Sequence, residues 1–255
     1  MSRGWAALGR AGLRSERRWD VGFAVASCAV FAVYNNAGGM LPWHRRRYTL
    51  LNVCATGAAL AAAAASGLTA TDVGLGSEEL APGLRLGSAA AAATVGGWVL
   101  IAAVPATRPA LRDGRITGLS GREVAHQALL RIPLGTVLWE ETAFRGVLQA
   151  ALGRVMPAGA AIAVTSCIFG IWHIAPTAAA LRINGLAGSP RRTLAGVSAG
   201  VAATAAGGVL LSWLRTRSGS LAAPILVHLA TNCGGALTAW AVARIEPPDA
   251  PVTRA

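Results

Sequence analysis

Long apolar stretches separated by short polar or arginine-containing segments recur along the chain. Their lengths are close to or above the roughly 20 residues that an α-helix needs to cross a 30 Å hydrocarbon layer. The stretches lie at 21–41, 49–70, 86–107, 124–152, 156–177, 193–214 and 220–243. This pattern predicts an all-α fold, a polytopic transmembrane helical bundle of about seven spans, with six to eight spans compatible with the sequence.

The polar segments suggest where the chain divides. A basic N-terminal segment, 1–20, precedes the first span. Because further spans follow, we interpret that first span as a retained helix rather than a cleaved signal peptide. Residues 21–123 are expected to hold N-terminal transmembrane helices and loops, and 124–243 a transmembrane core that carries the polar motifs. The proline-containing tail, 244–255, is expected to be disordered.

The composition supports a membrane protein, with 54% apolar and 13% charged residues among 255. A net charge of +12 would also suit a nucleic-acid partner. However, the arginines mainly flank apolar stretches, and aromatic positions do not alternate with them, so no nucleic acid is expected. Anionic lipid headgroups in the bilayer are the expected partners.

The basic residues also carry information about the source of the chain. All 23 of them are arginine, and alanine and glycine are abundant, which is typical of a GC-rich genome. The expected location is therefore a cell membrane, crossed several times, and specifically a bacterial inner membrane. Arginine counts at the two ends of the spans are similar, so the positive-inside rule leaves the orientation open.

Four cysteines lie far apart, each within an apolar stretch. No C-x-x-C pair or zinc-type spacing connects them. We interpret them as small packing residues and expect no redox chemistry. They are Cys28, Cys54, Cys167 and Cys233.

Two carboxylates and an arginine interrupt the apolar stretch 124–152. A charge at bilayer depth costs at least about 2.5–3.5 kcal/mol on insertion scales, so such residues usually face the protein interior or water. Glu141 and Arg145 are four residues apart and can pair on one helix face, whereas Glu140 is rotated by about 100° from its neighbour. A free Glu140 could activate water as a general base. The alternative is an interfacial helix whose charges contact lipid headgroups.

Two histidines lie in later apolar stretches. His173 follows Phe169 by four residues, and Pro176 is expected to end or kink the helix beside it. His228 and Asn232 are also four residues apart and place an imidazole and a carboxamide on one face. Together with the glutamates, these groups could converge on one polar site and donate to the oxyanion of a tetrahedral intermediate.

Three motifs follow one another on successive apolar stretches: E-E-x-x-x-R at 140–145, F-x-x-x-H at 169–173 and H-x-x-x-N at 228–232. In this order and context they resemble the CAAX-protease and bacteriocin-processing family of intramembrane endopeptidases, also called CPBP or ABI. The likeness is to its type II CAAX prenyl endopeptidases in particular. The resemblance covers 140–232 and says little about the first 120 residues.

The resemblance implies a role for each matching residue. Glu140 would be the base that activates the hydrolytic water, and His173 would help to hold that water. His228 and Asn232 would lie on the oxyanion side. The residues that match supporting positions of the family are Glu141, Arg145 and Phe169.

The cofactor remains open between none and zinc, with a slight preference for none. Glu140, His173 and His228 could supply three zinc ligands and leave a fourth position open. No H-E-x-x-H helix supports this independently. The family has been described both as metal-dependent and as a glutamate-type peptidase. The second mechanism better explains Asn232, because a metal could itself bind the oxyanion.

The expected function is hydrolysis of a peptide bond in a membrane-associated substrate, either a peptide or a membrane protein. The alternative is a non-enzymatic scaffold or a bacteriocin-immunity-type protein that keeps the motifs for packing. Transport or haem binding through the two histidines is a third possibility, but it gives no role to Asn232 and the glutamate pair together. The sequence does not indicate an oligomeric state.

Overall fold

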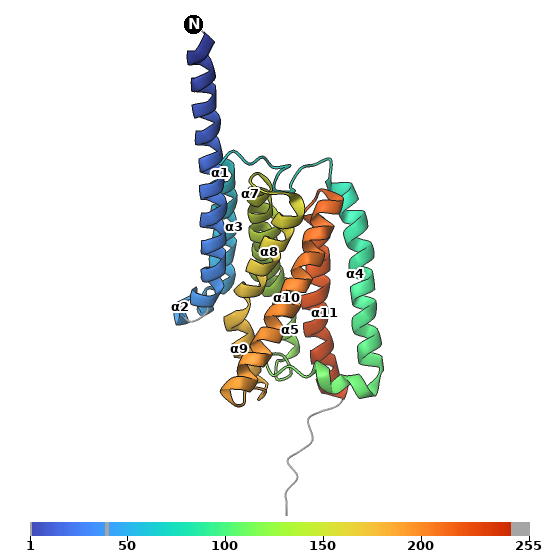
Figure 1. The fold of residues 1–255 in the computed structure, drawn as a ribbon. Helices are drawn as coiled ribbons and strands as arrows, with labels where there is room; N and C mark the ends of the chain where they lie inside the picture. Colours follow the sequence, from blue (N-terminus) through green and yellow to red (C-terminus); the bar gives the residue numbers. More distant parts are fainter. Residues whose placement is uncertain (1, 39–40, 246–255) are drawn as a thin grey trace, which may run out of the picture.

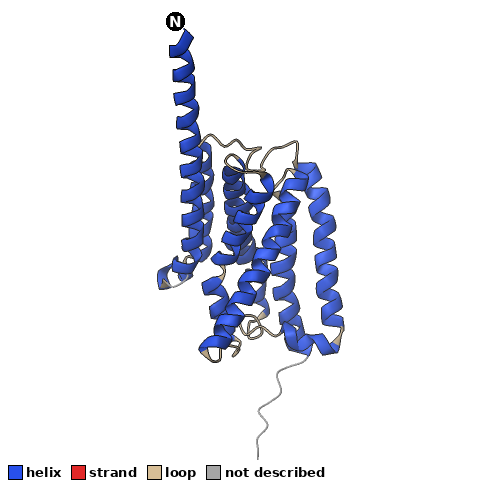
Figure 2. Cartoon of the chain, viewed as in Figure 1, coloured by secondary structure: helices blue, strands red, loops and turns tan. Residues whose placement is uncertain are grey.

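The computed structural model describes residues 2–38 and 41–245, and every regular element within these ranges is a helix (Figure 2). Six helical segments are long and apolar enough to cross a membrane. They are Arg17–Gly38, Tyr48–Ala65, Leu80–Ala103, Ala158–Ile183, Pro190–Ser218 and Ala222–Ile245. The predicted polytopic helical bundle is confirmed, and the chain is a multi-pass membrane protein.

The N-terminal part of the chain supplies helices at two edges of the bundle. α1 lies at one edge, and α4 lies beside α11 at the other, as Figure 1 shows. Residues 2–20 of the basic N-terminal segment are helical and continuous with the first span. The elements are α1 (Ser2–Gly38), α2 (Pro42–Arg46), α3 (Tyr48–Ala65), α4 (Leu80–Ala103) and the 3-10 helix η1 (Pro105–Leu111).

A further helical segment, residues 121–153, contains the E-E-x-x-x-R motif, and we call it the motif helix. It begins with a capping box in which Ser120 accepts from the backbone of Glu123 and the Glu123 side chain accepts from the backbone of Ser120. Two π-helical segments widen it, a feature that is frequent at functional sites. Its parts are α5 (Gly121–His126), η2 (Gln127–Val137), α6 (Leu138–Glu140), η3 (Glu141–Leu148) and α7 (Gln149–Gly153).

The motif helix is not among the six apolar spans, because its regular pieces are short and its middle is charged. It corresponds to the expected span 124–152. Its residues 141–148 are all buried, and Glu140 beside them is only 3% exposed. The alternative of an interfacial helix whose charges contact headgroups is therefore wrong.

Pro133 leaves one backbone carbonyl of the π-helical segment η2 without a donor from its own helix. A π-helix joins the N–H of residue i to the carbonyl of residue i−5, so the missing N–H of Pro133 leaves the carbonyl of Ala128 without its partner. The Cys233 thiol donates to that oxygen at 3.3 Å. Cys233 is thus more than a packing residue, and all four cysteines are free thiols.

The second half of the chain surrounds the motif helix. α8 and α10 pack along each other, and α11 packs against α4 and η2. The close approach of α4 to α11 requires glycine, because a Cβ at Gly87 would lie 2.7 Å from the Cα of Ala223. These elements are α8 (Ala158–Trp172), α9 (Ile174–Ile183), α10 (Pro190–Ser218) and α11 (Ala222–Ile245).

The connection 66–79 crosses one end of the bundle (Figure 1). Arg215 donates to the backbone oxygen of Asp72 at 2.8 Å, and the N–H of Leu221 donates to Gly74 O at 2.9 Å. Arg154 holds the start of the connection through the carbonyl of Gly67 at 2.6 Å. This end of the bundle is therefore held by hydrogen bonds that backbone oxygens of the connection accept. Of the tail 244–255 that was expected to be disordered, residues 244–245 belong to the helix that ends the described chain, and 246–255 lie outside the described residues. Positions 1 and 39–40 lie outside them as well.

Candidate active site

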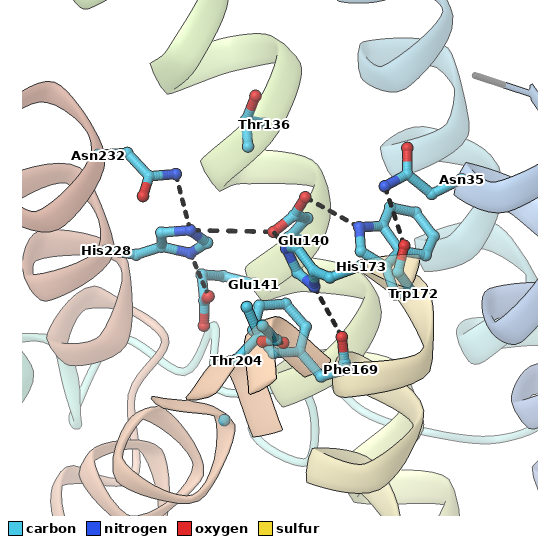
Figure 3. A network of polar contacts seen from close by, with 12 residues as sticks. Asn35, Thr136, Glu140, Glu141, Phe169, Trp172, His173, Thr204, His228 and Asn232 are labelled. Carbon is cyan, nitrogen blue, oxygen red and sulfur yellow. Dashed lines mark hydrogen bonds and ion pairs between the residues drawn. The ribbon is translucent and has the colours of Figure 1, made fainter. Parts of the chain in front are cut away.

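Glu140 lies near the middle of the motif helix with its carboxylate buried. Oε1 accepts the indole N–H of Trp172 at 3.0 Å, whereas Oε2 has no hydrogen-bond partner among the described residues. Oε2 lies 3.8 Å from Nε2 of His228 and 4.0 Å from Nε2 of His173. Figure 3 shows the carboxylate between these side chains. Such gaps are too long for direct hydrogen bonds, but a bridging water can span them.

Glu141 and Arg145 form the expected ion pair one helical turn apart. Their N···O distance is 3.0 Å, and both side chains are fully buried. The guanidinium lies 4.1 Å from the ring centroid of Phe169 and donates to Gly208 O at 3.4 Å. Phe169 therefore covers the arginine, and the charge of Glu141 is compensated within the pair, beside Glu140 on the motif helix.

His228 connects this ion pair to Asn232. Its Nδ1 lies 2.6 Å from Oε1 of Glu141, and because the carboxylate paired with Arg145 accepts, Nδ1 donates. In the neutral ring Nε2 then carries a lone pair, and it accepts from Nδ2 of Asn232 at 3.0 Å. The tautomer follows from these partners. A continuous polar chain thus runs from Arg145 through Glu141 and His228 to Asn232.

His173 occupies the joint between α8 and α9. The joint confirms the helix break expected near Pro176, because α8 ends at Trp172 and α9 begins at Ile174. Nδ1 of His173 lies 2.7 Å from the carbonyl oxygen of Phe169, which only accepts, so Nδ1 donates and Nε2 is free to face Glu140. The Phe169 ring meets the imidazole edge to face, with centroids 4.6 Å apart.

Comparison with protein families places this geometry in a known context. Residues 124–234 match the family model described as type II CAAX prenyl endopeptidase Rce1-like. This segment is similar to an Rce1-like domain. This match contains all three motifs and supports an intramembrane endopeptidase in general terms. No curated protein and no solved structure matches the chain.

The three polar motifs offer no ready metal site. Within residues 2–38 and 41–245, no group of three or more His, Cys, Asp or Glu side chains is arranged to hold a metal ion. One of the three proposed ligand atoms, Nε2 of His228, also already accepts from Asn232. Zinc would need the lone pair that this nitrogen offers to the amide, so Asn232 would have to move before His228 could bind an ion, and the arrangement does not fit a preformed centre.

Sequence reasoning missed three residues that contact this site or its supports. Trp172 donates to Glu140, and its position just before His173 in the second motif was the available signal. Asn35 and Asn36 of α1 donate to backbone oxygens of Trp172 and Ile171 at 3.2 and 2.8 Å. Two adjacent amides within the apolar stretch 21–41 could have indicated them, because polar groups at bilayer depth need partners.

Proposed function

We propose that the chain is an intramembrane endopeptidase in which Glu140 activates the hydrolytic water. The observation that carries the proposal is the buried Oε2 of Glu140, which has no hydrogen-bond partner within residues 2–38 and 41–245 and faces Nε2 of two imidazoles at 3.8 and 4.0 Å. A carboxylate left without a partner at bilayer depth is costly unless it serves a function.

In the proposed reaction, a water donates one hydrogen bond to Oε2 of Glu140 and another to the lone pair on Nε2 of His173. These two acceptors orient the oxygen lone pair of the water toward the scissile carbonyl. As the C–O bond forms, Glu140 takes the proton. When the C–N bond breaks, Glu140 returns that proton to the leaving amine, so the carboxylate is regenerated.

Asn232 and His228 lie on the side of the site where the oxyanion is proposed to form. One N–H of the Asn232 amide donates to His228, and the second is available to the developing oxyanion. His228, in its neutral tautomer, orients that amide, and it becomes an Nε2 donor itself only when the ring is protonated. Glu141 and Arg145 hold His228 in place through Nδ1.

The position of the site within a bundle of apolar helices indicates the class of substrate. We propose that residues 124–243 form the catalytic core and that the substrate is a peptide or membrane protein reached within the bilayer. The arginine-only basic composition favours a bacterial inner membrane. Nothing in the proposed reaction is routed through a metal ion.

The test compares protein termini in membranes of cells that express the wild-type chain or Glu140→Gln at equal levels. The matched control is Glu123→Gln, which changes a glutamate on the same helix but preserves its capping geometry. We expect new termini in wild-type and control cells that vanish with Glu140→Gln. Identical termini in all three samples would instead support the scaffold or immunity-type function.

A further inference from the structure

The break between α8 and α9 leaves backbone groups without helical partners on both sides of His173. In a continuous α-helix, the N–H of Ala175 would donate to the carbonyl of Ile171, and residue 176 would donate to the carbonyl of Trp172. Pro176 has no N–H to give. Buried or lipid-facing backbone groups of this kind need another partner.

Two adjacent amides of α1 meet that need. Nδ2 of Asn36 donates to Ile171 O at 2.8 Å and to Ala32 O at 2.9 Å, while its Oδ1 accepts from the N–H of Ala175 at 2.9 Å. The Asn36 amide therefore stands between the two groups that would otherwise bond to each other. Because two carbonyls need donors and one N–H needs an acceptor, the orientation of the amide is determined.

Asn35 completes the arrangement. Its Nδ2 donates to the carbonyl of Trp172 at 3.2 Å, which is the oxygen that Pro176 leaves without a partner (Figure 3). The residues on either side of that peptide bond are those that approach Glu140, since Trp172 donates to Oε1 and His173 faces Oε2.

We propose that Asn36, assisted by Asn35, is a positioning residue that holds the α8–α9 joint open and so aims Nε2 of His173 at Glu140. This inference rests on the proposed function. Without the Asn36 amide, Ile171 and Ala175 can bond directly, which closes the turn and rotates His173. Both asparagines lie outside the Rce1-like match at 124–234, so α1 supplies part of the support for the site.

The first test measures kcat and KM of the full-length protein in vesicles, with the peptide identified by the terminus comparison. Asn36→Ala and Asn36→Asp each remove the N–H that Ile171 needs, and Asp keeps the size and the acceptor. Since misplacement of a reacting group by about 1 Å can cost about 100-fold, we expect kcat to fall about 10- to 100-fold, with KM little changed.

The matched control is Val33→Ala, which changes an exposed residue of the same helix. If the Asn36 variants keep the kcat of that control, the proposal is overturned. A rise in KM alone would overturn it as well, because the amide would then act on substrate binding and not on His173.

A second test needs no catalysis. Diethyl pyrocarbonate modifies accessible imidazole nitrogens, and mass spectrometry can compare His173 with the exposed His126 in one sample. We expect Asn36→Ala to change the modification rate of His173 but not that of His126, and an unchanged ratio would contradict the proposal. If Glu140→Gln retains activity while this ratio still changes, the proposed function fails and the positioning of His173 stands.

The role of Asn35 has its own test through Pro176. Pro176→Ala restores an N–H that can reach the carbonyl of Trp172, so it should make Asn35 dispensable. We expect Asn35→Ala to lower Tm less in the Pro176→Ala background than in the wild-type background. Equal decreases in both backgrounds would show that Asn35 does not act through that carbonyl.

Discussion

Trp172 donates its indole N–H to Oε1 of Glu140 across 3.0 Å and thereby determines which carboxylate oxygen faces the two histidines. The indole is held in turn by Tyr34, whose ring stacks on it with centroids 5.6 Å apart and an interplanar angle of 5°. With Oε1 occupied, Oε2 alone remains to bind the water of the proposed reaction. The residue beside His173 in the second motif thus orients the proposed base in the first.

Replacing Trp172 with phenylalanine removes this donor while keeping an aromatic ring. A hydrogen bond to a charged group contributes about 1.5–3 kcal/mol, so the carboxylate should become free to rotate and kcat should fall roughly 10- to 100-fold. The measurement is kcat at saturating peptide substrate, with the pH profile recorded alongside. An unchanged kcat would show that Glu140 is oriented without the indole.

Loss of Arg145 alone from the buried Glu141–Arg145 pair should destabilise the protein more than loss of both charges. Arg145→Met should lower the free energy of unfolding by about 3–5 kcal/mol, because Glu141 is left as an uncompensated buried charge. The double variant Glu141→Met with Arg145→Met should recover part of that loss, since neither charge remains. Reversible unfolding of the purified protein gives both values.

Activity should not recover with stability in that double variant. His228 loses the acceptor for its Nδ1 hydrogen bond, and the orientation of the ring is no longer fixed. A double variant that is both stable and active would mean that Glu141 serves only to pair with Arg145.

Asn232 is predicted to act on the reaction rather than on the fold. Asn232→Ala removes both amide donors, and loss of one oxyanion donor typically lowers kcat about 10²- to 10³-fold. Thr231→Val is the neighbouring control, because the Thr231 hydroxyl donates within its own helix, to Val227 O. Equal kcat values for these two variants would show that Asn232 does not stabilise the oxyanion.

Asp72, in the connection 66–79, should make the free energy of unfolding depend on pH. Hydrogen bonds from the backbone N–H and hydroxyl of Thr69, each 2.8 Å long, lower the pKa of Asp72 from its usual 3.8. Because the folded pKa lies below the unfolded one, the stabilisation is complete above the unfolded value and is lost as the pH falls through the folded value.

The corresponding variant is Asp72→Ala, followed by thermal unfolding across pH. It should lower Tm modestly at pH 7, and its difference from wild type should shrink as the pH falls below about 4. Asp72 is exposed, so the effect should also weaken in high salt. A Tm difference that is constant from pH 7 to pH 3 would show that the charge of Asp72 does not matter.

The helical bundle and the pairing within each motif could be predicted from the sequence, because both depend on short-range periodicity. Glu141 with Arg145, Phe169 with His173, and His228 with Asn232 are each one helical turn apart, and all three pairs are in contact. The convergence of the first and third motifs was inferred only from the cost of charges in lipid. The 2.6 Å contact between Glu141 and His228 depends on how the helices pack.

Other features could not be predicted because they join distant segments through the backbone. Asn36 reaches Ile171 across 135 residues, and no local pattern gives the register of α1 against α8. The π-helical segments were also missed. A proline such as Pro133 usually indicates a helix kink, and the sequence does not show that Cys233 donates to the carbonyl that Pro133 leaves free. Packing and the need to satisfy orphaned carbonyls determined these features.

The most direct test of the central claim is the kcat of purified Glu140→Gln in vesicles, with the peptide that the terminus comparison identifies. Loss of a general base typically costs 10²- to 10⁴-fold, so we predict a decrease of about this size while Glu123→Gln keeps wild-type kcat. Both variants replace a carboxylate on the same helix with an amide. Wild-type turnover by Glu140→Gln would contradict the account, because the water would then be activated elsewhere.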